Sequence, residues 1–124
     1  MAHFRIIDVR AQIDWFDARR SGGKGRTRAC RSGEQPDHAI GGTAPAVPGI
    51  IVFEGRDALA PGDSWCARVR FLCTGALGPL QVGSTWLIQE GRRKLGRGRV
   101  LQVLAEYAEG RRAPTMLASY PLPH

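Results

Sequence analysis

The sequence predicts an all-β fold, a closed antiparallel barrel of about six short strands. Its 16 glycines and 8 prolines are scattered along 124 residues, so they divide the chain into segments too short for long helices. Several of these segments alternate apolar and polar residues, as strands with one buried face do. No strand-helix-strand rhythm indicates a parallel sheet. A closed barrel is favoured because it leaves no unpaired strand edges.

The first half of the chain holds two expected strands separated by loops. Residues 4–13 form the first strand, with a bulge near Ile6 and Ile7 because the apolar residues on either side fall on different phases. Residues 18–31 carry 3 glycines and 6 cations without apolar periodicity, which indicates a long basic loop. Residues 34–48 are irregular, and residues 49–53 are a compact run of the kind found in buried strands.

The second half of the chain carries the clearest strand pattern. A turn at residues 61–63 precedes residues 65–71, where apolar side chains alternate with arginines. Residues 85–89 and 96–104 are the strands of a hairpin, joined by a turn at residues 90–93. The side chains expected to point into the barrel are Trp65, Val69, Phe71, Trp86 and Ile88, and those expected to point outward are Arg68, Arg70 and Gln89.

The second hairpin strand contains Gly96 and Gly98, which indicate a close backbone approach or a barrel corner. After Leu104 the strand pattern fades. We therefore predict a barrel domain over residues 4–104 and an extension over residues 105–124 that forms a short helix or is irregular.

Composition indicates a soluble, cytoplasmic protein. Hydrophobic residues make up 43% and charged residues 23%, and no apolar run approaches the ~18 residues of a membrane-spanning helix. The 3 cysteines form no CxxC pair, which argues against a secreted disulfide framework and indicates reduced thiols. Their spacing from the histidines does not resemble a structural zinc site, so we expect no metal and no cofactor.

The charge balance indicates the class of partner. The chain has 18 basic and 11 acidic residues, a net charge of +7 and a pI near 10.4. Such a field attracts phosphate backbones or acidic protein surfaces. The same charge can also serve only to keep a small domain soluble.

The second half of the chain resembles the C-terminal (third) domain of translation elongation factor Tu. The resemblance rests on the Pro61-Gly62-Asp63 turn, the alternating strand that follows, and residues 86–100, which read WLIQEGRRKLGRGRV. That family shows Phe-Ala-Ile-Arg-Glu-Gly-Gly-Arg-Thr-Val-Gly-Ala-Gly-Val-Val at the matching place. Upstream, residues 21–24 look like the Glu-Gly-Gly-Arg loop of the family, whereas residues 30–48 match poorly.

The resemblance implies a six-stranded antiparallel barrel that stands alone, without a GTPase domain. In the family this barrel packs on the GTPase domain, contacts the exchange factor and helps to hold the T-stem of aminoacyl-tRNA. By resemblance, Glu90 matches a glutamate that lies near the T-stem backbone. The chain departs from the family at Arg92, Arg97 and Arg99, which replace a glycine, an alanine and a valine, and these changes add positive charge.

Two groups of residues are candidate RNA contacts. The first belongs to the hairpin and consists of Glu90, Arg92, Arg93, Lys94, Arg97 and Arg99. The second is the basic loop, with Arg19, Arg20, Lys24, Arg26, Arg28 and Arg31. We expect the hairpin to contribute more, because in the family the corresponding loop faces the GTPase domain.

The sequence therefore predicts a non-enzymatic barrel that binds structured, tRNA-like RNA. A protein-docking, decoy or regulatory module, including an immunity protein against a translation-targeting toxin, is the alternative, since an acidic protein surface would suit the same cations. Nucleotide hydrolysis is not expected, because G-x-x-x-x-G-K-[ST] is absent and residues 22–25 lack its glycine spacing and hydroxyl. The carboxylates Asp8, Asp14 and Asp17 have no partner histidine, so they do not indicate acid-base catalysis.

Overall fold

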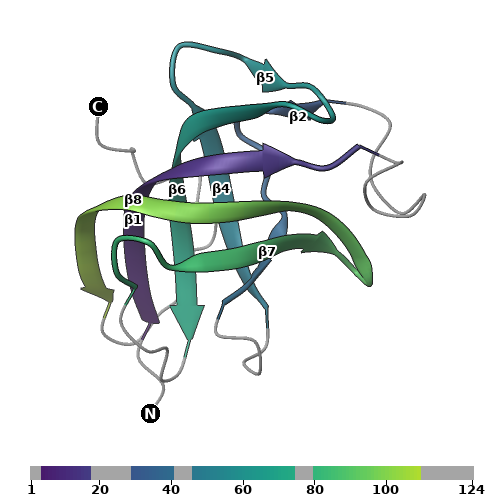
Figure 1. Ribbon diagram of the computed structural model, residues 1–124. Coiled ribbons are helices and arrows are strands. Elements are labelled where there is room, and N and C mark those ends of the chain that lie inside the picture. The colour runs from purple at the N-terminus through teal and green to yellow at the C-terminus, as the bar shows by residue number, and fades with distance from the viewer. Residues whose placement is uncertain (1–3, 18–28, 41–45, 75–79, 110–124) are drawn as a thin grey trace.

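The computed structural model describes the backbone of residues 4–17, 29–40, 46–74 and 80–109 (Figure 1). Within these ranges the regular secondary structure consists of β-strands only. The strands are β1 (Phe4–Trp15), β2 (Cys30–Arg31), β3 (Asp37–Ala39), β4 (Val47–Phe53), β5 (Ala58–Leu59), β6 (Ser64–Thr74), β7 (Thr85–Glu90) and β8 (Arg93–Glu109).

Six of these strands close into an antiparallel barrel. Their order around the barrel is β1-β6-β4-β3-β7-β8, and β8 pairs with β1 to complete the ring. The short strands β2 and β5 form a separate two-stranded sheet. The predicted fold class is therefore confirmed.

The barrel interior is filled by the alternating residues of the long strands. On β6, Val69 and Phe71 are fully buried, and on β7 Trp86 and Ile88 are buried as well. These four inward side chains match the sequence prediction. Their partners in the core from β1 are Val9, Ala11, Ile13 and Trp15.

The prediction for Trp65 is wrong, because its side chain is 43% exposed. Trp65 is the second residue of β6 and pairs with Ile13 near the end of the β1-β6 ladder, so it lies at one end of the barrel. Its indole lies instead against the turn after β4. Its Nε1 donates to the backbone oxygen of Glu54 at 2.6 Å, and the Arg56 guanidinium lies 4.5 Å from the ring centroid.

The bulge expected in the first strand lies in β8 instead. The pairing of β1 with β6 is continuous from Phe4 to Asp14, so β1 itself is regular there. Against β1, β8 skips Leu104 and Leu101, which are the extra residues of two irregularities. The two apolar phases of β1 need no bulge because Ile6 and Ile7 are both buried although they point to opposite faces.

Arg70 points outward, as predicted, but its side chain is buried. It lies on the phase opposite to Val69 and Phe71, so the predicted strand phase holds, and its side chain is only 2% exposed. It faces Asp8 across the β1-β6 pair, and its Nε and Nη2 donate to the two carboxylate oxygens at 2.6 and 2.7 Å. Arg68 and Gln89 remain partly exposed, as predicted.

A histidine at the centre of the barrel joins β3 to β4 and β7. Trp86 Nε1 donates to His38 Nδ1 at 2.9 Å, which leaves the His38 Nε2 proton to be donated to the Gly49 carbonyl at 3.0 Å. Phe71 meets the imidazole edge to face, with centroids 5.1 Å apart. Burial lowers the pKa of His38 to about 4, although the bond to Gly49 acts in the opposite direction. The ring is therefore neutral at physiological pH.

Gly98 provides space for this cluster from β8. It pairs with Trp86 in the register of β7 and β8, and a Cβ at Gly98 would overlap the indole ring. A Cβ at Gly96 would lie 2.5 Å from the backbone oxygen of Asp14. Both glycines therefore confirm the predicted close approach.

The barrel extends beyond the predicted domain boundary. Strand β8 continues to Glu109 and pairs with β1 as far as Phe4, so residues 105–109 are strand and not the start of a helix or an irregular extension. The remainder of the expected extension, residues 110–124, lies outside the described residues.

Replacing Asp8 by asparagine should destabilise the barrel by about 3 to 5 kcal/mol, because the buried guanidinium of Arg70 loses its compensating charge. Asp14→Asn on the same strand is the matched control. Asp14 meets Arg97 at 3.5 Å in a partly exposed pair, so it should cost at most about 1 kcal/mol. Urea unfolding measures both. Equal losses in the two variants would contradict the structural role of the buried pair.

Stability should fall between pH 6.5 and about pH 4 because of His38. The unfolded chain protonates this histidine below pH 6.5, whereas the folded chain does so only near pH 4. The unfolded state holds more protons in this window, so the free energy of unfolding decreases as the pH falls. At ~1.36 kcal/mol per unit, the pKa difference corresponds to roughly 3 kcal/mol.

Urea titrations of the wild-type chain and of His38→Gln, at neutral pH and near pH 4, measure this contribution. Glutamine keeps a donor and an acceptor but does not titrate. The variant should be less stable at neutral pH and should lose less stability on acidification. An equal acid loss in both proteins would show that His38 is not responsible.

Candidate functional site

The turn of the β7-β8 hairpin presents three adjacent cations to solvent. Glu90 pairs with Arg93, and Gly91 adopts a φ of 60°, in the left-handed region that tight hairpin turns use. Arg92, Arg93 and Lys94 are all exposed. The turn therefore carries a local excess of positive charge.

A bulge at Leu95 places the remaining cations of the hairpin on the outer surface. Gln89 pairs with Lys94 and Ile88 pairs with Gly96, so Leu95 is an extra residue, and its side chain is buried in the core. Without this extra residue, a strand with Lys94 outward would direct Arg97 and Arg99 into the barrel. With it, both arginines are exposed.

The outer face continues from β8 across β1 to β6. Gln12 of β1 lies between Arg99 and Cys66, and Asp14 lies between Arg97 and Ser64. One step further along β1, Arg10 and Arg68 are direct cross-strand partners. These two arginines were not predicted as part of the site, because only the pairing of distant strands brings them to the outer face of β8, β1 and β6.

Within the part of the chain that the structure describes, few of the hairpin cations have a carboxylate partner. Within the described residues, no ion pair involves Arg92, Arg93, Lys94 or Arg99. Arg97 meets Asp14 at 3.5 Å. Burial raises the pKa of Asp14, but hydrogen bonds from Ser64, Gln12 and Arg97 outweigh it and lower the pKa overall. Asp14 is therefore ionised and offsets one of the five cations.

Glu90 lies at the acidic edge of the hairpin. It lines a depression of about 350 Å³ together with Glu34 and Asp37 and with uncharged neighbours from β7 and the segment before β3. Three carboxylates on this side disfavour a phosphate there. The side of the hairpin that carries Glu90 is therefore less favourable for an anion than the side formed by β8 and β1.

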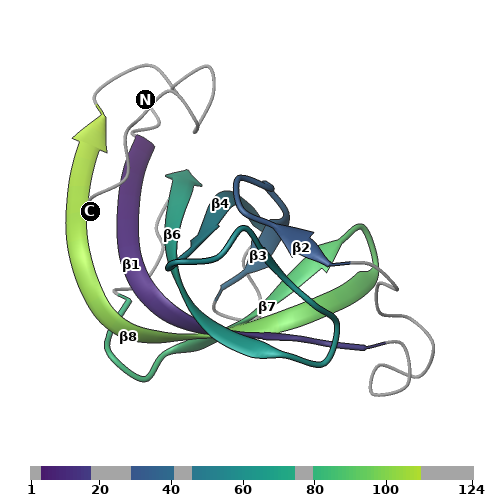
Figure 2. The ribbon, with the colours of Figure 1, turned by 90° about the horizontal axis from the view of Figure 1, so that it is seen from above.

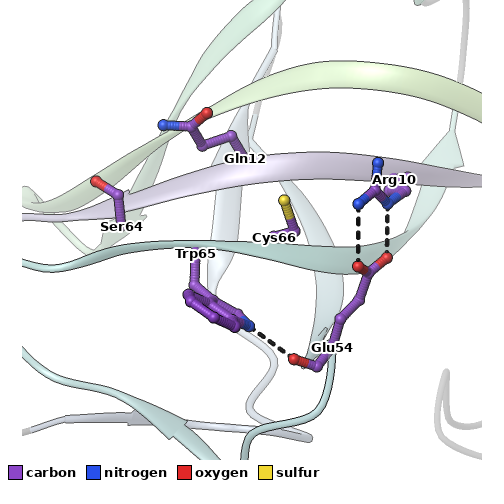
Figure 3. A pocket seen from close by; sticks show the side chains of 6 residues that line it. All are labelled: Arg10, Gln12, Glu54, Ser64, Trp65 and Cys66. Carbon is purple, nitrogen blue, oxygen red and sulfur yellow. Dashed lines mark hydrogen bonds and ion pairs between the residues drawn. The ribbon is translucent and has the colours of Figure 1, made fainter.

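The outer face of β8, β1 and β6, with the hairpin cations at one side, is called the cationic face below. A pocket of about 440 Å³ adjoins it. Figure 3 shows its lining residues, which come from β1, the turn after β4 and the start of β6: Arg10, Gln12, Glu54, Ser64, Trp65 and Cys66.

An ion pair forms one side of this pocket. Arg10 donates to the Glu54 carboxylate from Nε at 2.7 Å and from Nη2 at 3.2 Å. The hydrogen bond and the opposite charge raise the pKa of Arg10 and lower that of Glu54. The thiol of Cys66 lies beside the pair and is only partly buried. The Trp65 indole completes the side of the pocket next to Glu54.

Most of the predicted basic loop, residues 18–31, lies outside the described residues. The structure does not describe residues 18–28, which include Arg19, Arg20, Lys24, Arg26 and Arg28. Arg31 is described. It is exposed on β2, in the small β2-β5 sheet, and its backbone N–H donates to the Glu34 carboxylate at 2.6 Å. The structure therefore does not bring Arg31 into the face formed by β8, β1 and β6.

Two further features of the described ranges bear on the class of site. Among their His, Cys, Asp and Glu side chains, no group of three or more could hold a metal ion. In the same ranges, no helix has the length and apolarity needed to cross a membrane.

Neither a scan against protein-family models nor a search of curated proteins finds a match to this sequence. The resemblance to the third domain of elongation factor Tu therefore stays a prediction.

Proposed function

We propose that this chain is a binding module, without catalytic activity, that holds structured RNA of the tRNA-like kind through the outer face of the β7-β8 hairpin. The observation that carries the proposal is the bulge at Leu95. It turns Arg97 and Arg99 to the surface that already holds Lys94, and Arg92 and Arg93 extend this surface over the turn.

The arrangement favours contacts with the RNA backbone. Exposed guanidinium and ammonium groups bind phosphate oxygens and fix the position of a polyanion without reading its sequence. The net charge of +7 attracts the same kind of partner from a distance. The predicted family resemblance supports structured RNA, since it matches Glu90 to a residue near the T-stem.

The rigidity of the hairpin also supports recognition of a folded RNA. The strands β7 and β8 are paired from Thr85–Arg99 to Glu90–Arg93, and the buried Trp86, Ile88 and Leu95 anchor them in the core. The spacing of the cations is therefore set before binding, which reduces the conformational entropy lost on association.

Replacing Arg92, Arg93 and Lys94 together by alanine should weaken binding to a labelled transfer RNA. Each phosphate contact releases counterions, so the log-log dependence of affinity on salt should become shallower by roughly 2 to 3 units. Affinity should fall to a similar degree for unrelated folded RNAs, because phosphate contacts carry no sequence information. Fluorescence anisotropy over a range of salt concentrations measures both effects.

The matched control is the triple replacement of Lys24, Arg26 and Arg28, which removes the same charge from the basic loop. It should change the salt dependence less than the hairpin variant does. If the loop variant abolishes binding while the hairpin variant retains it, the assignment of the hairpin is wrong. A protein partner that co-purifies with the chain after nuclease treatment, with no measurable affinity for RNA, would instead favour the docking module.

A further inference from the structure

An exposed tryptophan is held in a fixed orientation beside the cationic face. Trp65 is 43% exposed, yet its Nε1 is bonded to the Glu54 carbonyl at 2.6 Å. The Arg56 guanidinium lies over the ring, 4.5 Å from its centroid. Because the side chain is already held in one orientation, it loses little conformational entropy when a planar ligand stacks on its exposed surface.

The polar groups beside the indole offer both hydrogen-bond donors and acceptors. The ion pair with Glu54 uses Nε and Nη2 of Arg10, and the third guanidinium nitrogen, Nη1, points away from Glu54 (Figure 3). Gln12 makes one long contact of 3.4 Å through its amide nitrogen to Asp14, and its carbonyl oxygen has no hydrogen bond within the described part of the chain. The Ser64 hydroxyl donates to Asp14 at 2.5 Å and can still accept.

The pocket of about 440 Å³ is large enough for a small ligand, and its charge and hydrogen-bonding groups favour one class of ligand over others. A cationic ligand is disfavoured, because Glu54, the one carboxylate among the lining residues, is already paired with Arg10, and Arg56 already occupies one face of the Trp65 ring. An aliphatic ligand would offer no hydrogen-bond partner to Nη1 of Arg10 or to the carbonyl oxygen of Gln12. A planar ring with donors and acceptors on its edge satisfies both the indole and the polar groups.

We propose that this pocket receives an unpaired nucleobase of the bound RNA, stacked on Trp65 with its edge toward Arg10 and Gln12. This inference rests on the proposed function, since the phosphates of the same RNA would lie over β8, on the other side of β1 from the pocket. Gln12 is paired with Arg99 on one side and with Cys66 on the other. Strands β8 and β6 are thus separated by two inter-strand spacings, roughly 10 Å, a distance that a dinucleotide can bridge.

The experiment compares two labelled probes, a blunt RNA stem and the same stem with a single-stranded overhang. The wild-type chain should bind the overhang probe more tightly. Trp65→Ala should lower affinity for the overhang probe by about 5- to 100-fold, the range that loss of one stacked base predicts, and should leave the blunt stem unchanged. Trp65→Phe, which keeps a ring but loses the bond to Glu54, should retain most of the preference.

Val82→Ala is the control variant, because Val82 is an exposed apolar side chain that does not line the pocket. It should bind both probes as the wild-type chain does. Thermal melting of each variant separates loss of the pocket from loss of the fold.

The outcomes distinguish this inference from the proposed function. If Trp65→Ala keeps the full preference for the overhang while the Arg92, Arg93 and Lys94 variant weakens both probes, the pocket inference is wrong and the hairpin assignment stands. If Trp65→Ala removes the preference while the hairpin variant has no effect, the pocket is supported and the hairpin assignment fails. If neither probe binds the wild-type chain, both proposals are wrong.

Discussion

The hydrogen bonding of β1 to two neighbours at once is the interaction on which the rest of this structure depends. β1 pairs with β6 over nearly its whole length and with β8 from Phe4 to Trp15, and the second pairing closes the barrel. Figure 2 shows β1 and β8 curving together around one side of the molecule. Closure fixes the face of each side chain, because a slip of one residue would exchange inside and outside.

Two buried polar interactions reinforce this register. Asp8 and Arg70 are direct partners across β1 and β6, and a shift of either strand would leave two buried charges apart. His38 acts in a similar way on the other side of the barrel, since its two ring nitrogens bind groups from β7 and β4. Apolar packing alone tolerates small displacements, whereas these bonds require one alignment.

The proposed interface follows from the same register. The outward residues of β1 lie between the cations of β8 and the start of β6, and two of them, Arg10 and Gln12, also line the pocket. The pocket therefore adjoins the face of the cations, whereas Trp65 reaches it from the inward phase at the end of β6. The core also reaches the hairpin directly, because Trp86 packs against Gly98 and Leu95 fills the space that its bulge makes available. The geometry of the cationic hairpin is thus a consequence of how the interior is packed.

The sequence by itself determined the antiparallel barrel, the inward phase of β6 and β7, the hairpin with its cations, and the close approach at Gly96 and Gly98. The strand phases, the hairpin and the glycines can be recognised locally, since alternation, turn residues and the absence of a side chain appear in short stretches of chain. The closed barrel was then inferred from these strands, because closure leaves no unpaired edges. Only the tertiary structure decided that Trp65 is exposed, that Arg70 is buried, and that Arg10 and Arg68 join the hairpin face. The physical reason is that alternation gives the phase of a strand but not where the barrel ends, what covers its outer surface, or which distant strand lies alongside.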